Sequence, residues 1–242
     1  MKILAEHMNK VKASEVSLVS ARALELERQG KEIIRLSAGE PDFPTPDHIR
    51  MACIKALCDN KTKYPPVIGL PELREAVCLK LKRDNALAYS PEQVIVSTGC
   101  KQVLFNAMTA TLNPGDEVAL TAPYWMTYAG IVEISRAVPV FIPTRLEDGF
   151  KASAQALEKA ITPRTKWLFL NSPGNPSGAV YSAEELQAFA DVLRRHPQVW
   201  ILSDDIYEFL VYDGVKFVSL LNVAPDLKDR FLVVNGLSKA YC

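Results

Sequence analysis

The chain has 242 residues, of which 48% are hydrophobic and 23% charged, so it can bury a full core as one large domain or two small ones. Lysine plus arginine and aspartate plus glutamate both total 28, and the formal net charge is zero. A neutral chain has no overall field that would attract DNA, RNA or anionic lipid, so we expect neither a nucleic-acid partner nor a membrane partner.

The N-terminal residues and the cysteine pattern favour a cytoplasmic protein. Residues 1–7 carry a lysine at position 2 and a glutamate at position 6, and so lack the apolar core of a signal peptide. The uncharged, apolar window at residues 118–132 is shorter than the ~20 residues of a spanning helix. Five cysteines and three histidines show no metal-ligand spacing, so we expect reduced thiols and no metal site.

Three helical stretches, residues 15–29, 47–59 and 71–85, come first in the chain. Proline-rich segments separate them, and the third begins with Pro71, which suits the first turn of a helix. We place the main boundary at 41–46, so that residues 1–46 form a leading segment and residues 47–242 the main domain.

Six short apolar runs then have the character of buried strands: residues 93–97, 117–121, 138–142, 166–170, 199–203 and 231–235. Helical patterns lie between most of them, at 101–111, about 124–136, and 183–195, the last opened by a capping box of Ser182 and Glu185. This alternation predicts an α/β fold with a mostly parallel sheet and helices on both faces.

Polar, glycine-bearing or aromatic clusters follow the carboxyl ends of five of these strands, at residues 98–101, 122–125, 171–178, 204–207 and 236–239. Open α/β sheets bind their ligands at this edge. We therefore expect five loops to converge on one crevice.

The first two loops each allow a functional and a structural interpretation. Gly99, Cys100 and Lys101 form a glycine turn into a helix, whose free N–H groups suit a phosphate, but many such turns bind nothing. The segment lacks the GxGxxG and P-loop patterns. Tyr124 and Trp125 either pack under the sheet as core aromatics or stack on a flat ring.

The last three loops carry amide, acid and amine groups. Residues 171–178 form a proline- and glycine-rich turn that is either a connection or a rigid mount for two asparagines. At least one of Asp204 and Asp205 is drawn into the interior, where it needs a donor or a cation such as a protonated ring nitrogen; a helix cap or metal ligand is the alternative. Lys239 is either a solvated charge or an amine that attacks a carbonyl.

Together these residues resemble the fold-type I pyridoxal-phosphate aminotransferases, in particular the prokaryotic aspartate aminotransferase branch. Matching segments run through essentially the entire chain: residues 38–43, 62–64, 69–75, 113–118, 123–125, 175–178, 203–208 and 235–241. The resemblance implies pyridoxal 5'-phosphate as cofactor and transamination between an amino acid, aspartate or glutamate, and a 2-oxo acid. Another fold-type I reaction such as β-elimination, or a non-catalytic remnant, is the alternative.

The resemblance also assigns the residues that bind the cofactor. Lys239 would form the Schiff base and move the proton between substrate and cofactor, while Asp204 would pair with the ring nitrogen. Tyr207 and Asn175 would bond the phenolic oxygen, and Trp125 would stack on the ring. The N–H groups of Gly99, Cys100 and Lys101 would hold the phosphate.

Substrate and partner contacts follow from the same resemblance. Gly39, Trp125 and Asn175 would touch the substrate. Tyr64 would reach the phosphate in the neighbouring subunit, which makes a homodimer part of the site.

Three features depart from the family pattern. Cys100 stands where glycine is common, and Pro65 follows Tyr64 where threonine is common. The chain ends three residues after Lys239, whereas the family continues with a phosphate-binding arginine, a further strand of the sheet and a small domain. The resemblance therefore predicts an incomplete large domain at 47–242, a segment 1–46 that would join the absent small domain, and poor folding of the fragment alone.

Overall fold

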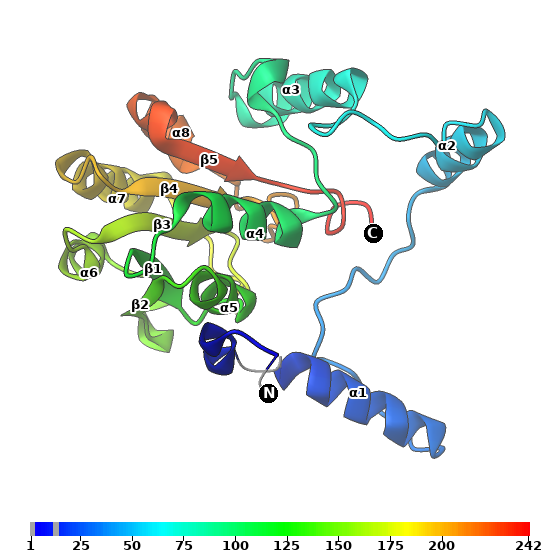
Figure 1. The fold of residues 1–242 in the computed structure, drawn as a ribbon, viewed down its shortest axis with the longest axis horizontal. Coiled ribbons are helices and arrows are strands. Elements are labelled where there is room, and N and C mark those ends of the chain that lie inside the picture. The colour runs from blue at the N-terminus through cyan, green and yellow to red at the C-terminus, as the bar shows by residue number, and fades with distance from the viewer. Residues whose placement is uncertain (1–2, 12–14) are drawn as a thin grey trace.

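The computed structural model describes residues 3–11 and 15–242 and centres on one five-stranded parallel sheet (Figure 1). The strands are β1 (Glu117–Ala122), β2 (Val138–Pro143), β3 (Thr165–Asn171), β4 (Trp200–Asp204) and β5 (Phe231–Val234). They lie in the order β2-β1-β3-β4-β5, and every neighbouring pair is parallel. Their carboxyl ends therefore meet at one edge, and the predicted mostly parallel α/β sheet is confirmed.

Alternating side chains along the strands build a separate hydrophobic core on each face of the sheet. Trp167 and Phe169 of β3 point into one core, and Leu168 and Leu170 into the other. The first face is covered by α4 (Cys100–Thr111) and α5 (Thr127–Ile134), and the second by α6 (Ala154–Ala160), α7 (Ala183–Arg195) and α8 (Leu220–Val223) (Figure 1).

Local signals in the sequence set the ends of two helices. The Ser182 side chain accepts a hydrogen bond from the Glu185 N–H, and the Glu185 side chain accepts one from the Ser182 N–H, so α7 begins where the capping box predicts. α3 (Pro71–Asn85) begins with Pro71, and Ala86, directly after its last residue, is left-handed with φ 55°. Both helices have the predicted bounds.

η1 (Glu6–Lys10) lies against α5, whereas the next two helices of the chain extend away from the sheet (Figure 1). α1 (Glu15–Arg28) and α2 (Asp47–Cys58) carry exposed apolar side chains, among them Leu18, Val19, Met51, Ile54 and Leu57. Short 3-10 helices complete the chain: η1 (Glu6–Lys10), η2 (Pro91–Gln93), η3 (Leu146–Asp148) and η4 (Pro225–Arg230). Within the described ranges, no helix has the length and apolar character that a membrane crossing requires.

The prediction of a strand at residues 93–97 is wrong. Residues 94–97 belong to no strand. Their main chain bonds another segment through the N–H of Val96, which donates to the main-chain carbonyl oxygen of Ile68 at 3.1 Å. A strand requires a neighbour to bond, and β5, at the end of the described sheet, pairs with β4 alone. The sequence analysis also missed the short helices α6 and α8.

Candidate active site

Asp204 closes β4 at the edge of the sheet where the loops gather. Its side chain lies on the same face as Leu202, toward α5, and the residue is only 3% exposed. The Tyr128 hydroxyl donates to Asp204 Oδ2 at 2.6 Å, and the Ile206 N–H donates to Oδ1 at 3.3 Å. The strand's alternation therefore places one carboxylate at a fixed point beside α5.

Burial governs the charge of Asp204. It raises the pKa of the Asp204 carboxyl, and the hydrogen bonds from Tyr128 and Ile206 oppose that rise. Among the ion pairs formed by residues 3–11 and 15–242, none involves Asp204. A buried carboxylate without a cation is a ready partner for a cationic group on a ligand.

Asn171 locks the turn 171–178 to the end of β4. Its Oδ1 accepts a hydrogen bond from the Asn175 N–H at 2.8 Å, and its Nδ2 donates to the main-chain carbonyl oxygen of Asp204 at 2.9 Å. Asn175 Nδ2 in turn donates to the Tyr207 hydroxyl at 3.3 Å. Burial raises the pKa of Tyr207, so this hydroxyl remains protonated at neutral pH.

The start of α4 lies on the other side of Asp204. Gly99 has φ 100° and open space where a Cβ would stand, and the first-turn N–H groups of Cys100 and Lys101 have no partner within the helix. The Cys100 thiol donates to the Asn235 oxygen at 3.1 Å, and burial raises its pKa to about 12. This thiol therefore joins the loop 98–101 to the segment that follows β5.

Trp125 joins the same group of contacts through its ring. It meets the ring of Tyr128 edge-on, with centroids 5.4 Å apart, and the Lys101 amine lies 5.3 Å from its centroid. Contacts thus link four of the predicted loops, directly or through Tyr128, and the Cys100 thiol joins them to Asn235, just before the fifth loop. Seven candidate residues lie at this edge of the sheet: Gly99, Cys100, Lys101, Trp125, Asn175, Asp204 and Tyr207.

Lys239 and Gly39 meet at the outer side of this region. Lys239 is half-buried on the segment after β5, and its amine donates to the carbonyl oxygen of the exposed Gly39. Tyr64 is fully exposed and has no ring contact or side-chain hydrogen bond with the other candidate residues that the structure describes. The structure therefore brings seven of the candidate residues together at one edge of the sheet and places Lys239 beside Gly39, while Tyr64 contacts none of them.

Three residues of this region escaped the sequence analysis. Tyr128 lies in an apolar helical pattern, which predicts only a core side chain. Glu208 and Asn235 bond each other across 27 residues, at 2.7 Å from Asn235 Nδ2 to Glu208 Oε1. Nothing in the local sequence indicates these partners, although Asn235 is the last residue of a predicted buried run.

Comparison with known proteins connects this geometry to a family. The model of the family described as "Aminotransferase class I and II" matches residues 31–242. A probable aspartate/prephenate aminotransferase of Rhizobium leguminosarum bv. phaseoli is 53% identical over 241 residues, which are 100% of this chain and 60% of the relative. An aspartate/prephenate aminotransferase of Cereibacter sphaeroides is 50% identical over 242 residues, with the same two coverages.

Solved structures give the same result. The aspartate aminotransferase of Rhizobium meliloti superposes with a TM-score of 0.95 at 48% identity and covers 100% of this chain, which spans 60% of that structure. The aspartate aminotransferase of Thermus thermophilus with maleate superposes with a TM-score of 0.94 at 46% identity, where the coverages are 100% and 62%. The chain thus spans about 60% of the length of these relatives.

Proposed function

The chain belongs to the class I and II aminotransferases, and we propose that the protein carrying it transfers an amino group between an amino acid and a 2-oxo acid. The observation that carries this proposal is the buried carboxylate of Asp204. Two neutral donors bond it, and no cation within the described ranges forms an ion pair with it. Asn175, Tyr207 and the start of α4 surround it with the donors that a flat, phosphorylated, cationic ring requires.

These residues fit pyridoxal 5'-phosphate, the cofactor of class I and II aminotransferases. Asp204 would hold the proton on its ring nitrogen, and the Cys100 and Lys101 N–H groups, freed by the open Gly99 turn, would hold its phosphate. When bound, the cofactor supplies an electron sink for the electron pair of the substrate's Cα–H bond.

Lys239, Trp125, Asn175 and Tyr207 complete the set. Lys239 would bind the cofactor's aldehyde carbon and later carry the proton taken from the substrate's Cα. Tyr207 and Asn175, already joined at 3.3 Å, would bond the phenolic oxygen, and Trp125 would cover one face of the ring. Gly39, which Lys239 contacts, would meet the substrate carboxylate together with Trp125 and Asn175.

We propose aspartate or glutamate as the amino donor. The relatives' names support aspartate, and several of them also name prephenate, which is itself a 2-oxo acid. Gly39, Trp125 and Asn175 would meet a carboxylate that every amino-acid substrate carries, so the choice of donor rests on the names of the relatives.

The proposal includes a homodimer, a cytoplasmic location and a division into two parts. The exposed Tyr64 and the exposed apolar residues of α2 suit a second subunit. Five free cysteines suit a reducing compartment. Residues 1–46 would join a small domain, since α1 stands away from the sheet, and residues 47–242 would belong to the large domain.

The test is the absorbance of the protein mixed with pyridoxal phosphate. The unaltered protein should develop the band of a lysine-bound cofactor, Lys239→Ala should not, and Lys166→Ala should behave as unaltered, because Lys166 pairs with Asp116 at the opposite end of the sheet. Turnover of aspartate with the 2-oxo acid of glutamate then tests the reaction. A band that persists in Lys239→Ala contradicts the proposal.

A further inference from the structure

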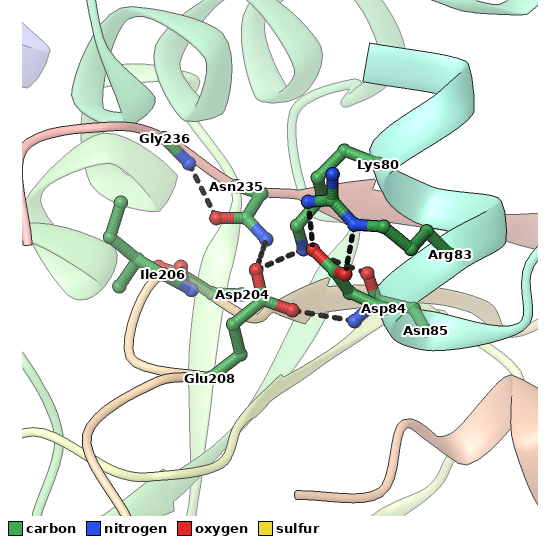
Figure 2. A network of polar contacts seen from close by, with 9 residues as sticks. All are labelled: Lys80, Arg83, Asp84, Asn85, Asp204, Ile206, Glu208, Asn235 and Gly236. Atoms are coloured by element: carbon green, nitrogen blue, oxygen red, sulfur yellow. Dashed lines mark hydrogen bonds and ion pairs between the residues drawn. The ribbon is translucent and has the colours of Figure 1, made fainter. Parts of the chain in front are cut away.

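Glu208 is a buried acid that the proposed chemistry leaves unused. It lies one residue after Tyr207, is 5% exposed, and sits between α3 and the segment that follows β5 (Figure 2). Its carboxylate forms an ion pair with Lys80 of α3 and accepts a hydrogen bond from Asn85 Nδ2 at 2.5 Å. Asn235 Nδ2 donates to the same carboxylate at 2.7 Å.

This arrangement fixes the Glu208 side chain in place. Both carboxylate oxygens accept hydrogen bonds, and Lys80 supplies the opposite charge. Removing one partner of a buried ion pair is strongly destabilising. Glu208 is therefore a rigid point to which other groups are tied.

Asn235 connects Glu208 to the main chain at Gly236. One end of its side chain donates to Glu208, and the other end, Oδ1, accepts the Gly236 N–H at 2.7 Å (Figure 2). The Asn235 carbonyl oxygen also accepts the Cys100 thiol at 3.1 Å. The chain is thus held on two sides at the point where it leaves β5.

Space at the next residue is tight. A Cβ on Gly236 would lie 2.9 Å from Cys100 Sγ and 2.9 Å from Ile206 Cδ1. Few backbone conformations fit this gap, and the hydrogen bond from the Gly236 N–H to Asn235 Oδ1 favours the one observed. Lys239 follows Gly236 by three residues, so its Cα lies at most about 11 Å from this anchor.

We infer that Glu208 is a positioning residue that acts through Asn235 on the segment carrying Lys239. The inference rests on the proposed function, in which Lys239 binds the cofactor. Glu208 also ties α3 to the sheet through Lys80 and Asn85, and a role confined to that tie would stabilise the fold without influencing Lys239. The two roles differ in whether Asn235 carries the effect.

The experiment measures how fast pyridoxal phosphate attaches to Lys239 in the complete protein, by the growth of its absorbance band. Glu208→Gln removes the charge at nearly constant shape and should slow attachment about tenfold or more, since small misplacements of a reacting group reduce rates by such factors. Asn235→Ala should slow it as well, and the double variant should be no slower than Asn235→Ala alone.

Glu117→Gln is the matched control. Glu117 is also a buried carboxylate, 4% exposed, and it accepts hydrogen bonds from Thr162 and, at 2.9 Å, from Arg164 Nε. It begins β1, at the end of the sheet opposite the site. Its substitution should lower the free energy of unfolding, measured with urea, and leave the attachment rate within about twofold of the unaltered protein.

Each outcome decides a separate point. Attachment by Glu208→Gln at the unaltered rate, or a double variant slowed by the product of the single effects, overturns the inference and leaves the proposed function standing. If the unaltered protein binds no cofactor at Lys239, the proposed function fails and the inference with it. If Glu208→Gln does not fold, Asn235→Ala alone tests the inference, since the Asn235 side chain is only half-buried. Attachment of the cofactor to Asn235→Ala at the rate of the unaltered protein would then overturn the inference.

Discussion

Replacing Tyr128 with phenylalanine tests whether Asp204 is held as a buried carboxylate. Tyr128 is 4% exposed, and its hydroxyl donates to Asp204 Oδ2 at 2.6 Å. Its ring packs edge-on against Phe169, with centroids 5.3 Å apart, a contact that phenylalanine retains. The substitution therefore removes one hydrogen bond and little else.

The expected loss depends on pH. A hydrogen bond to a charged group contributes about 1.5 to 3 kcal/mol and one between neutral groups about 1 kcal/mol. Without the Tyr128 hydroxyl, the pKa of Asp204, already raised by burial, rises further, so the variant takes up its proton first as the pH falls. The loss in unfolding free energy should thus be about 2 to 3 kcal/mol at high pH and shrink toward about 1 kcal/mol in acid.

Urea unfolding of the cofactor-free protein between pH 5 and pH 8 measures this difference. Tyr181→Phe is the control, because Tyr181 is equally buried and its hydroxyl accepts the neutral Ala152 N–H at 2.8 Å. Its loss should be about 1 kcal/mol at every pH in this range. A loss for Tyr128→Phe that stays constant with pH, or grows in acid, would refute the assignment of a charged Asp204.

Three further predictions concern its neighbours. Burial raises the pKa of Asp205 to about 7, so this group is protonated in the folded protein and ionised in the unfolded chain between about pH 4 and pH 7. Stability should fall as the pH rises through that window, by up to about 4 kcal/mol, and urea unfolding of Asp205→Asn should show a smaller fall. Gly236→Ala should slow cofactor attachment, and Cys100→Ala in the same chain should restore part of the rate, because the new methyl group meets the Cys100 thiol; no recovery would place the clash elsewhere. Iodoacetamide at pH 8, followed by mass spectrometry, should label the exposed Cys53 and spare Cys100, whose pKa burial raises to about 12.

Elements whose signals are local were predictable from the sequence. The Ser182 capping box and Pro71 mark the starts of α7 and α3, and both helices have the predicted bounds. The run at 93–97 has the same apolar character as the true strands, yet it forms none. Composition reports whether a segment suits a sheet, whereas strand formation also requires a neighbour.

In the candidate site too, residues with a local sequence signal were predictable and residues placed by distant contacts were not. Asp204 and Asp205 were predictable as interior acids, because they end a buried apolar run, and both are buried. Tyr128 was not, since its partner lies 76 residues away and only the packing of α5 on the sheet brings the two together. Residues that hold the site in place are found through their contacts, whereas the residues expected to bind ligands stand out by their type and their position after a strand.

Three acids within five residues, Asp204, Asp205 and Glu208, show how the fold separates similar side chains into different roles. Glu208 has Lys80 as a counterion, so its charge is balanced where it lies. Asp205, fully enclosed and bonded by Ser203, is pushed toward its neutral form, with a pKa raised to about 7. The Asp204 carboxylate has no cation beside it within the described ranges, although two hydrogen-bond donors fix its orientation. A cationic ligand therefore gains most by approaching Asp204, because Glu208 already has a counterion and burial holds Asp205 toward its neutral form.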